Sequence, residues 1–161
     1  MAELPARVDR LESAAAIRRL VSAYAVALDA RDLDTLLGLF APDVRASLVA
    51  PLRRIRTTIL HAGTHVIDFD TPDTAHGNVY TRAELEIGPD RWVAQAIHYG
   101  DRYVRRDGRW LFAGRRHELF YGADHGIRPN GLPPADWPRD DAGAGTVPYR
   151  WKTWQDFWEA A

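Results

Sequence analysis

The chain has 161 residues, of which 46% are hydrophobic and 27% charged, and its formal net charge is -1. These values predict one soluble globular domain with a single core, and the near-neutral charge argues against a nucleic-acid-binding surface. The absence of cysteine excludes disulfides, thiol catalysis and cysteine metal sites. The first residues lack the pattern of a secretory leader, and no stretch approaches the ~20 apolar residues of a membrane span, so we expect a cytoplasmic protein.

Two helices are predicted at the start of the chain. Ser13 can cap a helix that extends to about Ala30, and a second helix follows at residues 32–40. Asp29 is unexpected in the first helix, because a carboxylate in the last turn faces the negative end of the helix dipole. This unfavourable position suggests a functional role. The apolar stripes that predict the two helices are Ile17, Leu20, Val21, Tyr24 and Leu28, and Leu33, Leu36, Leu37 and Phe40.

Strand patterns follow the helices. Residues 44–50 are predicted as a strand, and residues 51–58 as a basic connector with one or two helical turns. Asp107-Gly108 is the strongest hairpin signal in the chain. Two helices followed by a meander of long antiparallel strands predict an α+β fold in which the helices cover one face of a curved sheet. The four long strands are expected at residues 61–70, 75–87, 91–106 and 109–121, with turns at 71–74 and 88–90.

The C-terminal part differs in composition. Glycine, proline and aspartate dominate from Gly122 onward, so we divide the chain into a domain at residues 1–121 and an extension at residues 122–161. The extension is expected to pack on the same domain or on a neighbouring subunit, or to act as a lid over a pocket. Its aromatic residues are spaced like one face of a short helix: Trp151, Trp154, Phe157 and Trp158.

Several stretches together resemble a known family. They are residues 11–20, the pair Tyr24-x4-Asp29, residues 32–36, the motif His61-Ala62-Gly63-Thr64-His65, and residues 103–112. In this order and at these separations they resemble the SnoaL-like group of the nuclear-transport-factor-2-like superfamily, over roughly residues 8–121. The resemblance implies a cone, or cystatin-like roll, in which a curved antiparallel sheet wraps around the helices and encloses an apolar pocket.

Within that group the chain resembles bile-acid dehydratases, scytalone dehydratase and hexachlorocyclohexane dehydrochlorinases. These enzymes remove water or hydrogen chloride with a histidine base paired with an aspartate, without metal or organic cofactor. The resemblance implies Asp29, His61 and Tyr24 as catalytic residues. Leu85 stands where scytalone dehydratase has a second histidine, and Leu48 where relatives have a tyrosine. The substrate-binding residues that it implies are Tyr99, Arg115, His117, Leu48, Ile97, Leu119 and His65.

The chemistry of an imidazole supports the pair. A neutral histidine takes a proton near pH 6.5 and can return it, and a carboxylate at its second nitrogen fixes the tautomer and stabilises the imidazolium. Asp29 and His61 are 32 residues apart, so only the fold can bring them together. We predict proton abstraction beside a carbonyl with loss of a β-hydroxyl or other group, and the enolate formed needs hydrogen-bond donors. Tyr24, Tyr99 and Arg115 are candidates.

Metal binding is not expected. A regular strand places His61 and His65 on the same face with Cα atoms ~13 Å apart, which is too far to share one ion. The other histidines show no metal-ligand spacing. We therefore predict no metal and no cofactor.

Other functions of the same fold remain open. One is an isomerase or polyketide cyclase, a second is a non-catalytic ligand-binding or assembly module, and a third is the structural subunit of a ring-hydroxylating oxygenase. A pocket in which the Asp29 carboxylate hydrogen-bonds His61 favours the enzymes, whereas a filled cone favours the binding or assembly classes. We expect a small hydrophobic, polycyclic or aromatic substrate.

A homo-oligomer, trimer or dimer, is also expected, because Trp92 and His98 lie opposite Ile97 and Tyr99 and form an outer sheet face.

Overall fold

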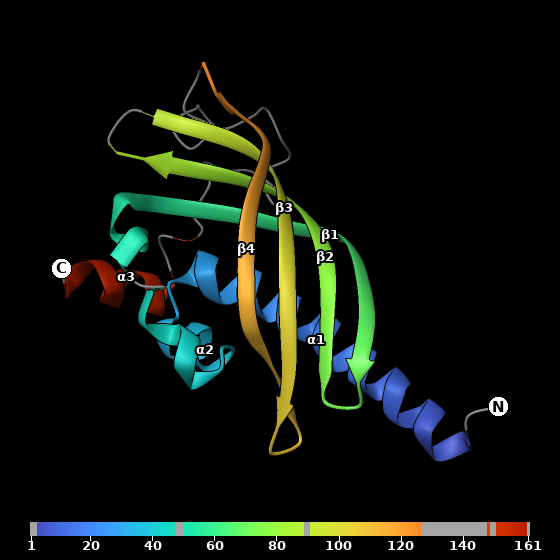
Figure 1. Ribbon diagram of the computed structural model, residues 1–161. Coiled ribbons are helices and arrows are strands. Elements are labelled where there is room, and N and C mark those ends of the chain that lie inside the picture. The colour runs from blue at the N-terminus through green and yellow to red at the C-terminus, as the bar shows by residue number, and fades with distance from the viewer. Residues whose placement is uncertain (1–2, 48–49, 89–90, 127–147, 149–150, 161) are drawn as a thin grey trace, which may run out of the picture.

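The computed structural model describes residues 3–47, 50–88, 91–126, 148 and 151–160. Four strands form one sheet in the order β1-β2-β3-β4, and each pair of neighbours is antiparallel (Figure 1). This arrangement confirms the α+β meander. The elements in chain order are α1 (Leu4–Ala30), α2 (Leu33–Gly38), the 3-10 helices η1 (Pro42–Ser47) and η2 (Ala50–Arg54), β1 (Ile55–Thr71), β2 (Thr74–Ile87), β3 (Arg91–Arg106), β4 (Arg109–Asp124) and α3 (Lys152–Glu159).

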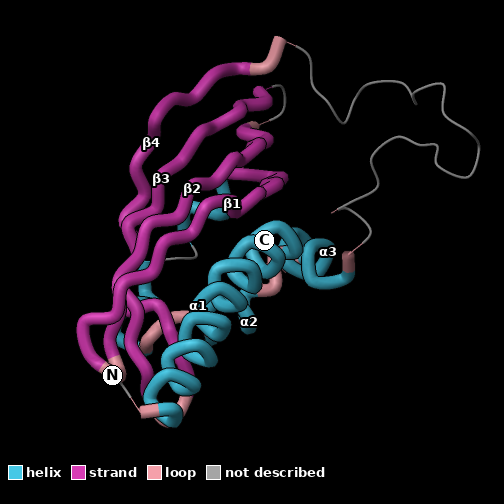
Figure 2. The backbone as a smooth tube through the Cα atoms, turned by 90° about the vertical axis from the view of Figure 1, so that its right-hand side faces the viewer, coloured by secondary structure: helices cyan, strands magenta, loops and turns pink. Residues whose placement is uncertain are grey.

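Helix α1 lies along one face of the curved sheet (Figure 2), which is the arrangement of a nuclear-transport-factor-2-like cone. The core lies between them, because the apolar stripe of α1 faces the inward side chains of the strands. Among the described helices, none combines the length and the apolarity that a membrane crossing requires. The large buried residues of this core include Ile17, Val21, Leu36, Phe40, Val79, Ile97, Tyr103 and Phe112.

The short segment after α2 attaches to the free edge of β4. The backbone N–H of Ala41 donates to the carbonyl of Phe112 at 2.9 Å, and the N–H of Phe112 donates to the carbonyl of Leu39 at 2.9 Å. The ring of Phe40 stacks on that of Phe112 with centroids 4.9 Å apart. These contacts hold α2 over the sheet at the side opposite β1.

Helix α1 begins earlier than the sequence predicted. It starts at Leu4 with a proline in its first turn, where the missing N–H costs nothing. Ser13 is therefore not a cap; it is buried within the helix, and its hydroxyl lies 3.5 Å from the Arg105 guanidinium.

The predicted strand at residues 44–50 is wrong. Residues Pro42–Ser47 form a 3-10 helix instead, and residues 48–49 lie outside the described part. An isolated strand pattern with no neighbour to pair with gains no ladder of hydrogen bonds, so local turns prevail. Strand β1 begins at Ile55, because the β-branched pair Thr57 and Thr58 joins the ladder with β2.

The hairpin turns agree with the sequence. Asp107 and Gly108 both have positive φ, 51° and 73°, as a two-residue turn between antiparallel strands requires. Pro72 and Asp73 form the two-residue connection between β1 and β2.

Helix α3 packs at the C-terminal end of α1. The hydroxyl of Thr153 donates to the carbonyl of Ala30 at 2.7 Å, and the indole N–H of Trp154 donates to the carbonyl of Arg56 at 3.3 Å. Phe157 is buried in the core and lies under the guanidinium of Arg53 at 4.5 Å. The aromatic face of this helix thus contacts its own chain.

Phe112 connects β4, Phe40 and the core, and its side chain is 0% exposed. We expect Phe112→Ala to lower the free energy of unfolding by about 3–5 kcal/mol, because it removes a ring and leaves a cavity. Urea titration measures this, with Val26→Ala as control, since Val26 is 64% exposed on α1. Equal stability losses in the two variants would contradict this account of the core.

Candidate functional site

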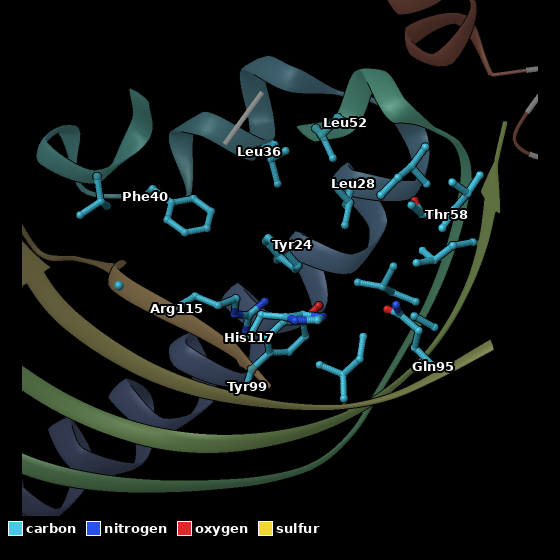
Figure 3. Close-up of a pocket in the computed structure, with 18 residues that line it drawn as sticks. Tyr24, Leu28, Leu36, Phe40, Leu52, Thr58, Gln95, Tyr99, Arg115 and His117 are labelled. Carbon is cyan, nitrogen blue, oxygen red and sulfur yellow. The ribbon is translucent and has the colours of Figure 1, made fainter. Parts of the chain in front are cut away.

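A cavity of about 640 Å³ opens between the helices and the sheet. This volume lies within the usual range of small-molecule sites. Most of its wall is apolar and comes from α1, α2, η2 and the inner face of all four strands (Figure 3). The polar side chains that reach it are few: Tyr24, Thr58, Gln95, Tyr99, Arg115 and His117.

Arg115 dominates the polar end of the cavity, and Asp101 holds it. Its Nε donates to one carboxylate oxygen of Asp101 at 2.7 Å and its Nη2 to the other at 2.6 Å. The two side chains are only 6% and 0% exposed. Burial alone lowers the pKa of Arg115, but the hydrogen bonds and charge of Asp101 raise it, and the net shift is upward. Arg115 therefore keeps its positive charge.

Aromatic rings surround the Arg115 guanidinium. The guanidinium carbon, Cζ, lies 4.3 Å from the ring centre of Tyr24, 4.2 Å from that of Tyr99 and 4.4 Å from that of Phe112. These are cation–π distances. Burial raises the pKa of Tyr99, so its hydroxyl keeps its proton and remains a donor.

A second layer fixes Asp101 from behind. The Tyr103 hydroxyl donates to Asp101 at 2.8 Å, and Nε2 of His65 lies 3.1 Å from the same hydroxyl. Since Tyr103 uses its proton on Asp101, His65 must donate through Nε2. Burial lowers the pKa of His65, which keeps this imidazole neutral. His65 therefore supports the polar end without lining the cavity.

His117 is the one histidine among the described lining residues. It follows Arg115 by two residues on β4. Its ring centre lies 5.5 Å from that of Tyr99. Burial lowers the pKa of His117, so the imidazole is neutral at physiological pH and able to accept a proton.

Asp29 binds the edge of β1. Its carboxylate accepts from the Thr58 hydroxyl at 2.8 Å and from the backbone N–H of Leu60 at 3.0 Å. Burial raises its pKa to about 6, although these hydrogen bonds and the charges of Arg31 and His61 act in the opposite direction. An aspartate with this pKa exchanges its proton near neutrality.

Arg31 completes this contact. Its Nη1 donates to the Thr58 hydroxyl at 2.9 Å and its Nη2 to the carbonyl of Ile55 at 2.7 Å. Burial lowers the pKa of Arg31 to about 10, against the charge of Asp29. Thr58 thus connects the two charged groups, because it accepts from Arg31 and donates to Asp29.

His61 follows Leu60, which binds Asp29, but its side chain points to the outer face of β1, away from the cavity. Thr58 and Leu60 line the cavity, so the alternation of a strand directs His61 to the outer face, where it is exposed opposite Arg82. The hydrogen bonds of the Asp29 carboxylate go to Thr58 and Leu60, and His61 acts on Asp29 only through its charge.

The expectation that His61 and His65 share one face is wrong. The pairing of β1 with β2 shifts by one residue between Ala62 and His65, and this bulge directs His65 inward to Tyr103. The two histidines are on opposite faces, which also removes the geometric basis for a shared ion. The described residues contain no group of three or more His, Asp or Glu side chains arranged for a metal.

The remaining predicted residues divide into three groups. Tyr24, Ile97 and Tyr99 line the cavity with Arg115 and His117. Leu119 pairs with Ile97 but is 51% exposed and is not a lining residue. Leu48 lies outside the described residues.

Sequence reasoning missed four contributors. Thr58 and Gln95 line the cavity, and Asp101 and Arg31 hold the residues that do. Asp101 lies fourteen positions before Arg115 across the Asp107-Gly108 hairpin, so counting residues from that turn would have placed the two nearly opposite each other.

The family profile described as the SnoaL-like domain matches residues 9–116. The chain belongs to the SnoaL-like domain family. The matched segment begins within α1, includes Tyr24, Asp29, the His61 motif and Arg115, and ends just before His117. None of the curated proteins with which this SnoaL-like chain was compared matches it.

Solved structures share the fold of this SnoaL-like domain. A scytalone dehydratase-like protein from Novosphingobium aromaticivorans is 23% identical with a TM-score of 0.67, over 76% of this chain and 93% of that one. Hexachlorocyclohexane dehydrochlorinase LinA-type3 from Novosphingobium barchaimii is 22% identical with a TM-score of 0.66, over 75% of this chain and 96% of that one. The structure of LinA is 24% identical with a TM-score of 0.69, over 76% of this chain and 96% of that one. At these identities the likeness establishes the nuclear-transport-factor-2-like fold.

Asp29 makes stability depend on pH. Its pKa of about 6 in the folded protein exceeds the ordinary 3.8, so the folded state binds this proton more tightly than the unfolded chain. The resulting stabilisation is complete below the unfolded pKa and is lost as pH rises through the folded pKa. We expect the stability of the wild type relative to Asp29→Asn to fall by on the order of 2 kcal/mol between about pH 4.5 and about pH 7.5 in urea titrations. A difference that is constant over this range would contradict the raised pKa.

Proposed function

We propose that the protein is a cofactor-independent lyase, similar to a dehydratase, that acts on a small hydrophobic, aromatic or polycyclic substrate. The observation that carries the proposal is the apolar cavity with hydrogen-bond donors gathered at one end. Structures of similar fold include a scytalone dehydratase-like protein and hexachlorocyclohexane dehydrochlorinases, which supports an elimination.

The proposed reaction begins with removal of a proton from the carbon beside a carbonyl. The electrons move to the carbonyl oxygen, where Arg115, Tyr24 and Tyr99 supply donors for the developing negative charge. Collapse of the enolate expels the group on the next carbon, and the acid form of the base or water protonates that group. The apolar wall excludes water, which strengthens each of these interactions.

We propose that His61, supported by Asp29, is the base. Two observations support this assignment. The Asp29 carboxylate accepts a hydrogen bond from the backbone N–H of Leu60, the residue before His61. The β-bulge after His61 is of a kind that often redirects side chains next to active sites. The pair requires His61 to turn from the outer face toward the cavity. His117, which already lines the cavity, is the competing base.

Three variants separate the two bases. We expect His61→Ala and Asp29→Asn to lower kcat by ~10²- to 10⁴-fold, because they remove positioned acid/base catalysis. His117→Gln is expected to raise KM with a smaller effect on kcat. The probe is 3-hydroxy-1-tetralone, a β-hydroxy ketone that loses water to give 1-naphthol, which is followed by its absorbance.

His76→Gln is the control, because His76 is exposed and pairs with Asp70 on the outer face. All variants should retain the cooperative urea unfolding of the wild type. Full turnover in His61→Ala together with its loss in His117→Gln would assign the base to His117 and refute the proposed pair.

An isomerase or cyclase of the same fold would use the same proton transfer without expelling a group. Product analysis distinguishes these reactions, since only the lyase releases water from the probe. A ligand-binding or assembly module would bind the probe and return it unchanged.

The proposal includes a homo-oligomer, dimer or trimer. Its support is an apolar outer face on β2 and β4, where Tyr80, Phe120 and Tyr121 are exposed and the rings of Tyr80 and Phe120 lie 5.2 Å apart. We expect Phe120→Lys to shift the protein toward monomer in sedimentation velocity, because a charge in an apolar interface is unfavourable. Leu11→Lys, at an exposed position of α1, should leave the association unchanged. A monomeric wild type would refute the oligomer.

A further inference from the structure

The charge at the polar end of the cavity is already balanced before any ligand arrives. Arg115 is the only arginine or lysine among the described lining residues, and the buried Asp101 carboxylate grips it through two hydrogen bonds. A guanidinium carries five N–H groups, so those not used on Asp101, including both on Nη1, stay able to donate. The site therefore offers donors but no net positive charge.

The Asp101 carboxylate cannot turn away to make room for another anion. Its side chain is 0% exposed, and the Tyr103 hydroxyl donates to it from behind at 2.8 Å, with His65 in turn behind Tyr103. A ligand carboxylate placed at Arg115 would face a second carboxylate across one guanidinium. It would also lose its hydration without gaining an unpaired cation.

A carbonyl oxygen meets neither difficulty. It accepts from Arg115 as a neutral group, so it pays little desolvation and feels little repulsion from Asp101. The neighbouring groups suit such a ligand: the Tyr99 hydroxyl keeps its proton, and His117 is neutral. The rest of the wall is apolar and accommodates a hydrocarbon body.

We propose that this cavity selects neutral carbonyl compounds with an apolar ring body and discriminates against carboxylates, because Asp101 already neutralises Arg115. This specificity rests on the proposed function only in taking the cavity as the substrate site. Asp101 is thereby a specificity-determining residue that acts through Arg115.

Three ligands with one bicyclic skeleton test the selection. They are 1-tetralone, which has a carbonyl; tetralin, which has no acceptor; and tetralin-1-carboxylate, which has a charge. We expect 1-tetralone to bind the wild type about 10-fold tighter than either of the others in calorimetric titrations at pH 7.5, since one hydrogen bond to a charged donor contributes about 1.4 kcal/mol or more.

Asp101→Asn tests the cause. This change keeps the shape and an acceptor oxygen but removes the negative charge, so we expect tetralin-1-carboxylate to gain about 10-fold in affinity while 1-tetralone changes little. Asp70→Asn is the matched control, because Asp70 pairs with His76 on the exposed face and should alter neither ligand. If Asp101→Asn does not fold, the wild-type series still decides.

Equal or tighter binding of the carboxylate by the wild type would overturn the proposal, as would the absence of measurable 1-tetralone binding. A folded Asp101→Asn protein with unchanged preference would overturn the role of Asp101. Because these are binding measurements, a protein that prefers 1-tetralone but never eliminates water would refute the lyase and leave the selectivity standing.

Discussion

The attachment of the end of α1 to the edge of β1 is the contact on which the cavity depends. Arg31 has a left-handed backbone conformation with φ of 55°, which costs about 1–3 kcal/mol for a residue other than glycine. Its guanidinium offsets this cost through hydrogen bonds to Leu28, Thr58 and Ile55, and Asp29 adds the bond to Leu60. These bonds occupy the backbone groups that an edge strand leaves unpaired. They also fix how far the helix stands from the sheet.

The helices α1 and α2 form a hairpin, and this hairpin is also attached to the opposite edge of the sheet. After α2 the chain pairs with β4 at Phe112, through Leu39 and Ala41. The hairpin therefore bridges β1 and β4 above the concave face, and the space below it is bounded on both sides by hydrogen bonds. Side chains such as Leu28 and Leu36 form the roof of the cavity. A site with fixed walls can hold donors in place before a ligand arrives.

The features predicted correctly from the sequence are those with local signals, whereas the side-chain orientations that were missed on β1 and the pairing that was missed between β3 and β4 depend on bulges. Helical spacing and the Asp107-Gly108 turn predicted the helices and the meander. On β1 the extra residue between Ala62 and His65 separates the faces of His61 and His65, and Gly63 within the strand was a signal for it. On β3 and β4 the register shifts between Arg102 and Tyr103. This shift places Asp101 opposite Arg115, whereas regular pairing from the turn would place it opposite Gly114. Inward or outward orientation past a bulge follows from the paired strand, which periodicity within one strand does not contain.

The Arg115–Asp101 pair is also informative because the fold does not require it. A buried ion pair gains little stability over apolar side chains of the same volume, since the desolvation of both charges offsets their attraction. The surrounding rings of Tyr24, Tyr99 and Phe112 show that the position accepts apolar neighbours. Packing alone would thus be satisfied by a hydrocarbon pair. What such a pair could not provide is a donor held rigidly toward the cavity with no net charge behind it. The hydrogen bonds that hold Asp101 from Tyr103 and His65 fix that orientation, which supports the proposed role of these buried polar residues in ligand selection.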